Sequence, residues 1–168
     1  MFVDVGANVG YNILVASKLV RSRGPVYAIE PAPSTASLLK ASVKLNGCSN
    51  VIVHEAAAWS CNGEVTLSVP KSFYGYASII RESEEKLTVK AMTLDEILQK
   101  VDSIDLVKID VEGAEREVLI GARESLNRIK YIIVELSCNI REVLRFLTQH
   151  EFKFKKFKFT TYLLAYRE

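Results

Sequence analysis

Several protein classes are excluded by what this chain of 168 residues lacks. It holds only 8 glycines and 4 prolines, too few for a collagenous or low-complexity chain. Its three cysteines, Cys48, Cys61 and Cys138, show no C-x-x-C spacing, which argues against a zinc ribbon or a disulfide framework and favours a reducing compartment. No apolar run approaches the roughly 18–20 residues that span a bilayer, and the first residues do not resemble a secretory signal. We therefore expect a cytoplasmic protein with no membrane span.

An excess of charge of one sign is also missing. Lys and Arg number 22 against 20 Asp and Glu, and the net charge of +2 leaves little surplus for binding phosphate backbones. A nucleic-acid partner is therefore not expected. With 49% apolar and 25% charged residues the composition is that of an ordinary globular protein, and the length predicts a single domain over residues 1–168. The open first strand leaves pairing with a second copy, as a homodimer, as an alternative to a monomer.

Apolar runs and helical periodicity alternate along the first third of the chain. Buried strands are predicted at Phe2–Val5, Val26–Ile29 and Val51–Val53, and helices from Tyr11 to Arg23 and from Pro33 to Asn46. This order of strands and helices predicts a parallel sheet that is covered by helices on both faces.

The middle of the chain has a different pattern. Short alternating runs at Glu64–Val69, Ala77–Ile80 and Leu87–Lys90 predict a small antiparallel insertion at the rim of the sheet. A helix is predicted from Thr93 to Gln99, with Thr93 as its cap.

The alternation then resumes. We expect a strand at Leu106–Val111, a helix at Ala114–Leu126 with a break at Gly121, and a strand at Tyr131–Leu136. A helix from Ile140 to His150 follows, and the tail predicts two antiparallel strands. The predicted fold class is therefore α/β, a doubly wound and mostly parallel sheet with a small antiparallel insertion and an antiparallel C-terminal hairpin.

The first predicted turn reads Asp4-Val-Gly6-Ala-Asn8-Val-Gly10, at the edge of the sheet where ligands bind in such folds. Its glycines let the backbone approach a ligand, and the next helix offers its positive end. A dinucleotide site would want G-x-G-x-x-G, but Asn8 replaces the second glycine and the Asp4 carboxylate would repel a pyrophosphate. The charges suit a ligand with an ammonium, a sulfonium and a carboxylate, which is S-adenosylmethionine. A tight turn with no ligand is the alternative.

Glu30 follows the second predicted strand. It lies 24 positions after Gly6, close to the offset of about 20 residues expected for an acid that holds a ribose diol. One carboxylate can accept from two ribose hydroxyls, so an adenosine-type ligand fits. The alternative is a solvated acid at a strand end.

Four segments together resemble a known family. Phe2–Gly10, Ile29–Pro31, Asn50–Val51 followed by Ala57, and Lys108–Glu115 occur in this order, and the run I-D-V-E-G-A-E is the most distinctive part. The set resembles the FkbM family of S-adenosylmethionine-dependent methyltransferases, most of whose known members resemble O-methyltransferases. The similarity extends from Phe2 to about Glu135. It implies the Rossmann-like class I methyltransferase fold, S-adenosylmethionine as cofactor, and a small-molecule or sugar acceptor.

The resemblance also implies roles for individual residues. Asp4, Gly6, Asn8 and Gly10 would form the site for the methionine end of the cofactor. Glu30 would hold the ribose, and the segment from Glu55 to Ala57 would border the adenine.

Two acids follow the fourth parallel strand, and they are the candidate catalytic residues. Methyl transfer to oxygen requires alignment and removal of the hydroxyl proton. Asp110 is predicted to lie beside the transferred methyl, as a general base, and Glu112 to face the acceptor. The alternative is that Asp110 caps the next helix. Lys108 is unusual in a central strand and is expected to pair with Asp110 or another acid.

The acceptor side has further candidates. Glu135, at the end of the next strand, is expected to border the acceptor, with a solvated strand-end acid as the alternative. Tyr76 and Ser78 lie in an aromatic, glycine-containing loop that suits a lid over the acceptor, or that packs on the rim. Oxygen ligands from Asp110, Glu112 and Glu135 could also hold Mg²⁺, although no metal site is the expectation.

Two alternatives to an O-methyltransferase stay open. One is an RNA methyltransferase of similar fold, against which stand the small basic surplus and the lack of an N-P-P-Y-type stretch. The other is a catalytically silent module that binds an adenosyl nucleotide. It applies if the site is left open because this sequence lacks the residues that family members usually carry ahead of the first strand.

Overall fold

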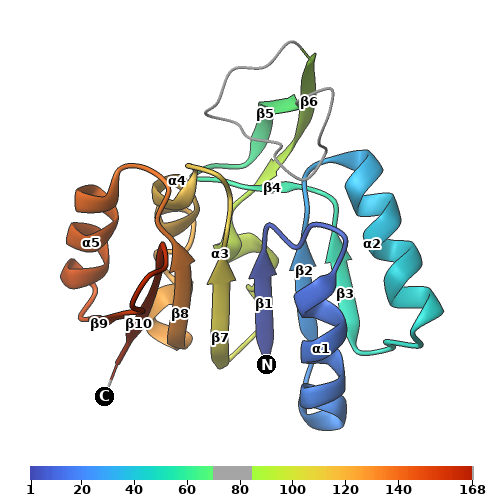
Figure 1. The fold of residues 1–168 in the computed structure, drawn as a ribbon, viewed down its shortest axis with the longest axis horizontal. Helices are drawn as coiled ribbons and strands as arrows, with labels where there is room; N and C mark the ends of the chain where they lie inside the picture. Colours follow the sequence, from blue (N-terminus) through green and yellow to red (C-terminus); the bar gives the residue numbers. More distant parts are fainter. Residues whose placement is uncertain (70–84, 168) are drawn as a thin grey trace.

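The computed structural model describes residues 1–69 and 85–167. Seven strands form one sheet in the order β3-β2-β1-β7-β8-β10-β9. Neighbours from β3 to β8 pair in parallel, whereas β10 pairs antiparallel with both β8 and β9 (Figure 1). The bounds are β1 Phe2–Val5, β2 Val26–Ile29, β3 Val51–His54, β7 Ile104–Ile109, β8 Ile129–Glu135, β9 Lys153–Lys156 and β10 Tyr162–Tyr166. The mostly parallel sheet with an antiparallel C-terminal hairpin is confirmed.

Helices cover both faces of this sheet because its buried strands are apolar on both sides. On one face α1 (Tyr11–Val20) and α2 (Pro33–Leu45) pack on a cluster that includes Phe2, Val26 and Ala28. On the other face lies the larger cluster, which includes residues of α3 (Leu94–Ile97), α4 (Glu115–Ile120) and α5 (Ile140–Gln149). The doubly wound prediction is therefore confirmed.

A second, three-stranded sheet has the order β4-β6-β5. β5 (Gly63–Val69) pairs antiparallel with β6 (Glu85–Met92), as predicted, and β4 (Ala57–Ala58) pairs in parallel with β6. β4 was not predicted, because two residues are too short to show a period. The predicted strand Ala77–Ile80 lies outside the described residues.

The predicted break at Gly121 is confirmed, because α4 ends at Ile120 and Gly121 is its C-cap. The predicted continuation of the helix to Leu126 is wrong, because a short 3₁₀ helix, η3 (Ser125–Arg128), follows instead. A Cβ at Gly121 would overlap the carbonyl oxygen of Trp59, and the Asp95 carboxylate accepts from the backbone N–H groups of Glu124 and Ser125 at 3.1 and 2.7 Å. These tertiary contacts end one helix and start another. The predicted first helix is likewise shorter, with α1 followed by the 3₁₀ helix η1 (Arg21–Arg23).

The predicted cap at Thr93 is confirmed, because its hydroxyl oxygen accepts from the N–H of Glu96 at 3.1 Å. Within the described ranges, no helix combines the length and the apolar character that crossing a membrane requires. The carboxyl ends of the parallel strands all point to the same edge of the sheet (Figure 1), which is the edge where the predicted site residues lie.

Candidate active site

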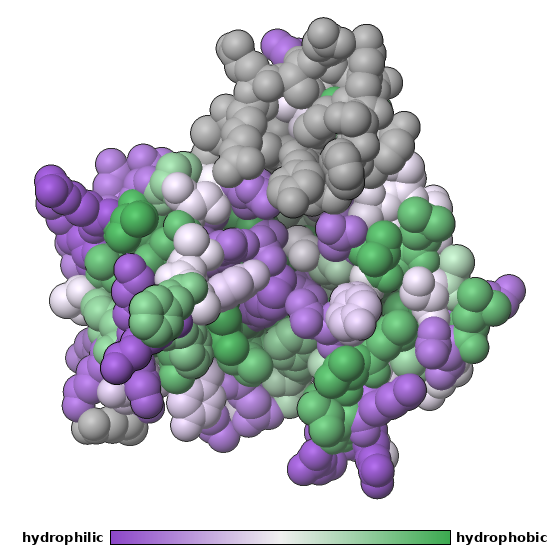
Figure 2. Space-filling model, in the orientation of Figure 1, coloured by the Kyte–Doolittle hydropathy of each residue, from purple (hydrophilic) through white to green (hydrophobic). Residues whose placement is uncertain are grey.

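A cavity of about 550 Å³ opens at the carboxyl edge of the parallel strands. Its walls come from the segments that follow β1, β2 and β7, from the end of β8, and from β4 and β5 of the small sheet. In the view of Figure 2, hydrophilic side chains gather at the centre of the molecule, where its surface is hollowed. The strand order reverses between β1 and β7, so the cavity lies at the switch point where open sheets of this kind bind ligands.

Main-chain contacts hold the turn after β1. The N–H groups of Gly6 and Ala7 both donate to the carbonyl oxygen of Ile29 at 3.0 Å. Gly6 has a φ of +82°, and a Cβ there would overlap the carbonyl oxygen of Asp110. The glycine is therefore required by the packing of the protein itself. Asn8 has a φ of +51°, which Asn tolerates better than most residues, so it fulfils the conformational role of the second glycine.

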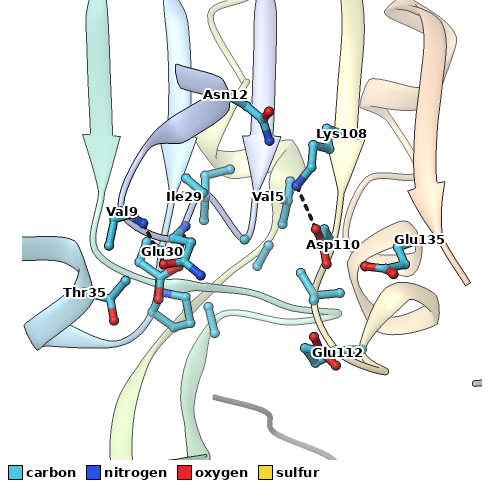
Figure 3. Close-up of a pocket in the computed structure, with 18 of the residues that line it drawn as sticks. Val5, Val9, Asn12, Ile29, Glu30, Thr35, Lys108, Asp110, Glu112 and Glu135 are labelled. Atoms are coloured by element: carbon cyan, nitrogen blue, oxygen red, sulfur yellow. Dashed lines mark hydrogen bonds and ion pairs between the residues drawn. The ribbon is translucent and has the colours of Figure 1, made fainter. Parts of the chain in front are cut away.

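The Glu30 carboxylate is fixed by the backbone around it. Its Oε2 accepts from the N–H of Asn8 at 2.9 Å and its Oε1 from the N–H of Ala32 at 3.0 Å. Burial raises the pKa of Glu30, and these two donors oppose that rise. Thr35 also lines the cavity on this side (Figure 3), and its buried hydroxyl has no hydrogen-bond partner among the described residues. A ligand with polar groups would meet a fixed acceptor and an unsatisfied hydroxyl here.

Lys108 joins two carboxylates on the face of the sheet that carries α1. Its Nζ lies 3.2 Å from Oδ1 of Asp4 and 3.1 Å from Oδ2 of Asp110. Asp4 is fully buried, and burial raises its pKa to about 6 although Lys108 lowers it. Burial opposes the charge of Lys108 as well, but the two carboxylates outweigh it and raise the pKa of the ammonium. The predicted pairing of Lys108 is confirmed.

The C-terminal hairpin supplies a second set of donors. The Tyr162 hydroxyl donates to Oδ2 of Asp110 at 3.2 Å, and the Thr161 hydroxyl donates to Oε1 of Glu135 at 2.8 Å. Tyr162 reaches this place because it lies opposite Glu135 in the antiparallel pairing of β8 and β10. Burial and the charges of Asp110 and Glu135 raise the pKa of Tyr162, so its hydroxyl stays a donor.

Asp110 and Glu135 have pKa values that are shifted in opposite directions. Burial raises the pKa of Asp110, but hydrogen bonding with Glu135 and the charge of Lys108 outweigh it and leave that pKa below its ordinary value. Hydrogen bonding with Asp110, and then burial, raise the pKa of Glu135, and the donor Thr161 opposes them. Of the two carboxylates, Glu135 is therefore the one with the higher affinity for an added proton.

The turn after β7 is tied to the segment after β8. Buried Glu115 accepts from the N–H of Gly113 at 3.0 Å and from the hydroxyl of Ser137 at 2.9 Å, both through Oε1. Glu112 has a φ of +52°, an uncommon conformation for a long side chain, and lines the cavity. The alternative that Asp110 caps the helix is wrong, because the N-cap of α4 is Ala114 with no side-chain cap hydrogen bond.

Most of the predicted site residues line the same cavity, at the carboxyl edge of the parallel strands. These are Gly6, Asn8, Glu30, Ala57, Asp110, Glu112 and Glu135.

Three predicted cofactor residues are not among the described residues that line it. Asp4 lies behind Lys108, and Gly10 is the N-cap of α1, packed against Leu39. Glu55 is exposed and forms an ion pair with Lys40 of α2. Tyr76 and Ser78 lie outside the described residues.

Thr35, Thr161 and Tyr162 join the site without having been predicted. Thr35 lies in the first turn of α2, where the sequence pattern indicates only the start of a helix. The two hairpin residues belong to no motif. The alternation of the tail gave the only signal, since it predicts a strand beside the end of the sheet. Among the described residues, no group of three or more His, Cys, Asp or Glu side chains is arranged to hold a metal ion.

Comparison with known proteins shows the family of this chain. The Methyltransferase FkbM domain matches residues 4–154. The chain belongs to the FkbM methyltransferase family. It is 28% identical over 151 residues to the hexuronic acid methyltransferase AglP of Haloferax volcanii, a match that covers 87% of this chain and 60% of AglP. The chain thus spans about three fifths of the length of that relative.

Solved structures share the fold. A methyltransferase FkbM from Methylobacillus flagellatus matches with a TM-score of 0.72 and 18% identity, over 98% of this chain and 42% of that one. The fibrillarin of Aeropyrum pernix, whose crystals held S-adenosyl-L-methionine, matches with a TM-score of 0.58 and 13% identity, over 98% of this chain and 64% of that one. The fold of this FkbM member is therefore the Rossmann-like fold of class I methyltransferases.

Proposed function

We propose that this FkbM domain is a methyltransferase that uses S-adenosylmethionine to methylate a hydroxyl oxygen of a small molecule or sugar. The observation that carries the proposal is the charge of the cavity. Glu30, Asp110, Glu112 and Glu135 line it, against Lys108 as the one cation among the described lining residues, and that lysine already pairs with two carboxylates.

The residues on the Glu30 side fit the adenosyl part of this cofactor. The carboxylate has its orientation set by two backbone donors and retains lone pairs for ribose hydroxyls. The Thr35 hydroxyl is an unsatisfied buried donor in the same wall, and such groups are costly unless a ligand or water satisfies them. Ala57 adds an apolar surface.

The residues around Asp110 fit the methionine end of this cofactor. A sulfonium and an ammonium would be stabilised by the nearby carboxylates, whereas a pyrophosphate would be repelled. Asp4 contributes to this field through Lys108 rather than by direct contact, since it is buried behind that side chain.

When bound, S-adenosylmethionine supplies an electrophilic methyl group. The chain would align an acceptor hydroxyl against it and accept the proton that the hydroxyl loses. Asp110 and Glu112, on the turn after β7, and Glu135, at the end of β8, are the carboxylates placed for this task. The turn that carries the first two is fixed by Glu115, which keeps the alignment rigid.

The relative AglP suggests a sugar as the acceptor class, since its name describes a hexuronic acid methyltransferase. The acidic wall favours a hydroxyl over a carboxylate as the methylated group, because a second anion beside Glu112 and Glu135 would be repelled. Methyl α-D-glucoside, a neutral sugar, and glucuronic acid therefore serve as paired acceptor probes.

Ligand-induced stabilisation tests the cofactor first. S-adenosylmethionine or its demethylated product, at about 100 times its dissociation constant, should add about 2.7 kcal/mol to the free energy of unfolding. NAD should give no such effect, and a preference for NAD would contradict the proposal.

Transfer of a labelled methyl group to the two sugar probes tests the reaction. We expect an ether product, with the neutral sugar methylated on a hydroxyl. Binding of the donor with no transfer to any acceptor would indicate a catalytically silent binding module, and transfer to RNA alone would indicate an RNA methyltransferase.

A further inference from the structure

Resting on the proposed function, we propose that Glu135 is the catalytic base that takes the acceptor's proton, and that Tyr162 and Lys108 hold Asp110 beside it as a permanently charged partner. This reverses the role that the sequence motif suggests for Asp110.

The hydrogen bonds around Asp110 leave it little capacity to act as a base. Its Oδ2 receives both the Lys108 ammonium, at 3.1 Å, and the Tyr162 hydroxyl, at 3.2 Å. A proton arriving there would have to displace a cation and a hydroxyl donor, each of which favours the charged carboxylate.

Glu135 has the opposite surroundings. Its Oε1 accepts from the Thr161 hydroxyl at 2.8 Å, and the side chain lines the cavity from the end of β8 (Figure 3). The titratable groups that face it are the negative carboxylates of Asp110 and Glu112 and, from β10, the hydroxyl of Tyr162. Two neighbouring anions make Glu135 the carboxylate on which a proton is best accommodated, and its raised pKa agrees with this.

The proton transfer balances with the methyl transfer. The acceptor hydroxyl loses its proton to a carboxylate oxygen of Glu135. The oxygen uses a lone pair to form the bond to the methyl carbon, while the carbon–sulfur bond of the donor breaks and its electron pair stays on sulfur. The products are a methyl ether, a neutral thioether and a protonated Glu135, which returns its proton to water.

Tyr162 is a positioning residue in this scheme. Its hydroxyl donates to Oδ2 of Asp110, which lowers the affinity of Asp110 for a proton and leaves Glu135 as the stronger base of the two. Removal of its hydroxyl makes Asp110 a better competitor for that proton. The residue is therefore expected to affect the division of the proton between the two carboxylates more than the fold.

Carboxyl ¹³C NMR titration of the chain tests the proton's location without any acceptor. The upper titration step of the pair should be seen mainly at the carboxyl carbon of Glu135. In Tyr162→Phe this step should be divided more evenly between Glu135 and Asp110. Tyr166→Phe, on the same face of β10 but opposite Tyr131, is the matched control and should titrate like the wild type.

Single-turnover methyl transfer to methyl α-D-glucoside tests the chemistry. Glu135→Gln should slow transfer about 100-fold or more, as loss of a general base does, and Glu135→Asp should recover part of the rate. S-adenosylmethionine affinity should stay within about threefold, which shows that the variants still fold and bind.

Two results would overturn the assignment. One is an upper titration step that belongs to Asp110 in the wild type. The other is an Asp110→Asn variant that loses transfer while Glu135→Gln retains it. A wild type that binds the donor but methylates nothing would contradict the proposed function instead, and the titration would still decide which carboxylate holds the proton.

Discussion

The two halves of the cavity are built by different means. On the Glu30 side the groups are held by main chain: two N–H groups fix the carboxylate, and a positive φ at Asn8 shapes the turn. On the Asp110 side the groups are held by other side chains, from Asp4 through Lys108 to Tyr162. The first half depends on local backbone conformation, and the second on contacts between charged side chains that are buried or partly buried and far apart in the sequence.

Replacement of Lys108, the cation between Asp4 and Asp110, should destabilise the Asp110 side of the cavity more than any other change. Lys108→Met leaves Asp4 buried without a counter-charge, and removal of one partner of a buried pair costs about 3–5 kcal/mol. Chemical denaturation at pH 8 measures the loss, which should shrink at pH 5 because Asp4 then protonates. Lys40→Met, which breaks an exposed pair with Glu55, should cost less than about 1 kcal/mol. Equal costs for the two variants would refute the distinction.

The first half should be sensitive to a single methyl group. Gly6→Ala forces a side chain into a positive φ and against the Asp110 carbonyl, and should lower the free energy of unfolding by about 2–5 kcal/mol. Gly47→Ala is the control, because its φ is also positive, at +63°, with nothing within 4 Å of the added atom. It should cost about 1 kcal/mol, and the excess at Gly6 measures the close backbone approach.

The sequence predicts those features that are encoded by residues close to one another in the chain. The turn from Asp4 to Gly10 and the acid at Glu30 belong to contiguous motifs, and the parallel sheet followed from the alternation of strands and helices. The sequence could not predict Tyr162, whose contact with Asp110 spans 52 residues and depends on the pairing of β8 with β10. The family resemblance implies that Glu55 borders the adenine, whereas in the structure Glu55 pairs with Lys40 and is not among the described residues that line the cavity.

The pH dependence of stability should report Asp4. Its folded pKa of about 6 lies above its ordinary value of 3.8, so the folded state binds this proton more tightly than the unfolded chain does. Stability from this group is full below pH 4 and is lost as the pH rises through 6, by about 3 kcal/mol in total. As the pH rises from about 4 to above 6, the free energy of unfolding of the wild type should therefore fall relative to that of Asp4→Asn. Asp102→Asn, at an exposed position that does not line the cavity, is the control substitution.

The smallest effect is expected for ligand affinity at the backbone-held carboxylate. Glu30→Gln should weaken S-adenosylmethionine binding about 10- to 100-fold, as loss of a charged hydrogen-bond acceptor does, with little change in the rate of transfer. Glu55→Gln should change affinity less than twofold, since that residue lies away from the lining. Isothermal titration of both variants separates them, and a larger effect at Glu55 would place the adenosyl group elsewhere.

The position of Tyr162 in the chain has a consequence for assembly of the site. The backbone-held half is formed by the segments that follow β1 and β2, whereas the tyrosine donor to Asp110 lies on β10. The Asp110 half is complete only once β10 has paired with β8, so loss of this pairing would leave the Glu30 half in place and Asp110 without one of its donors.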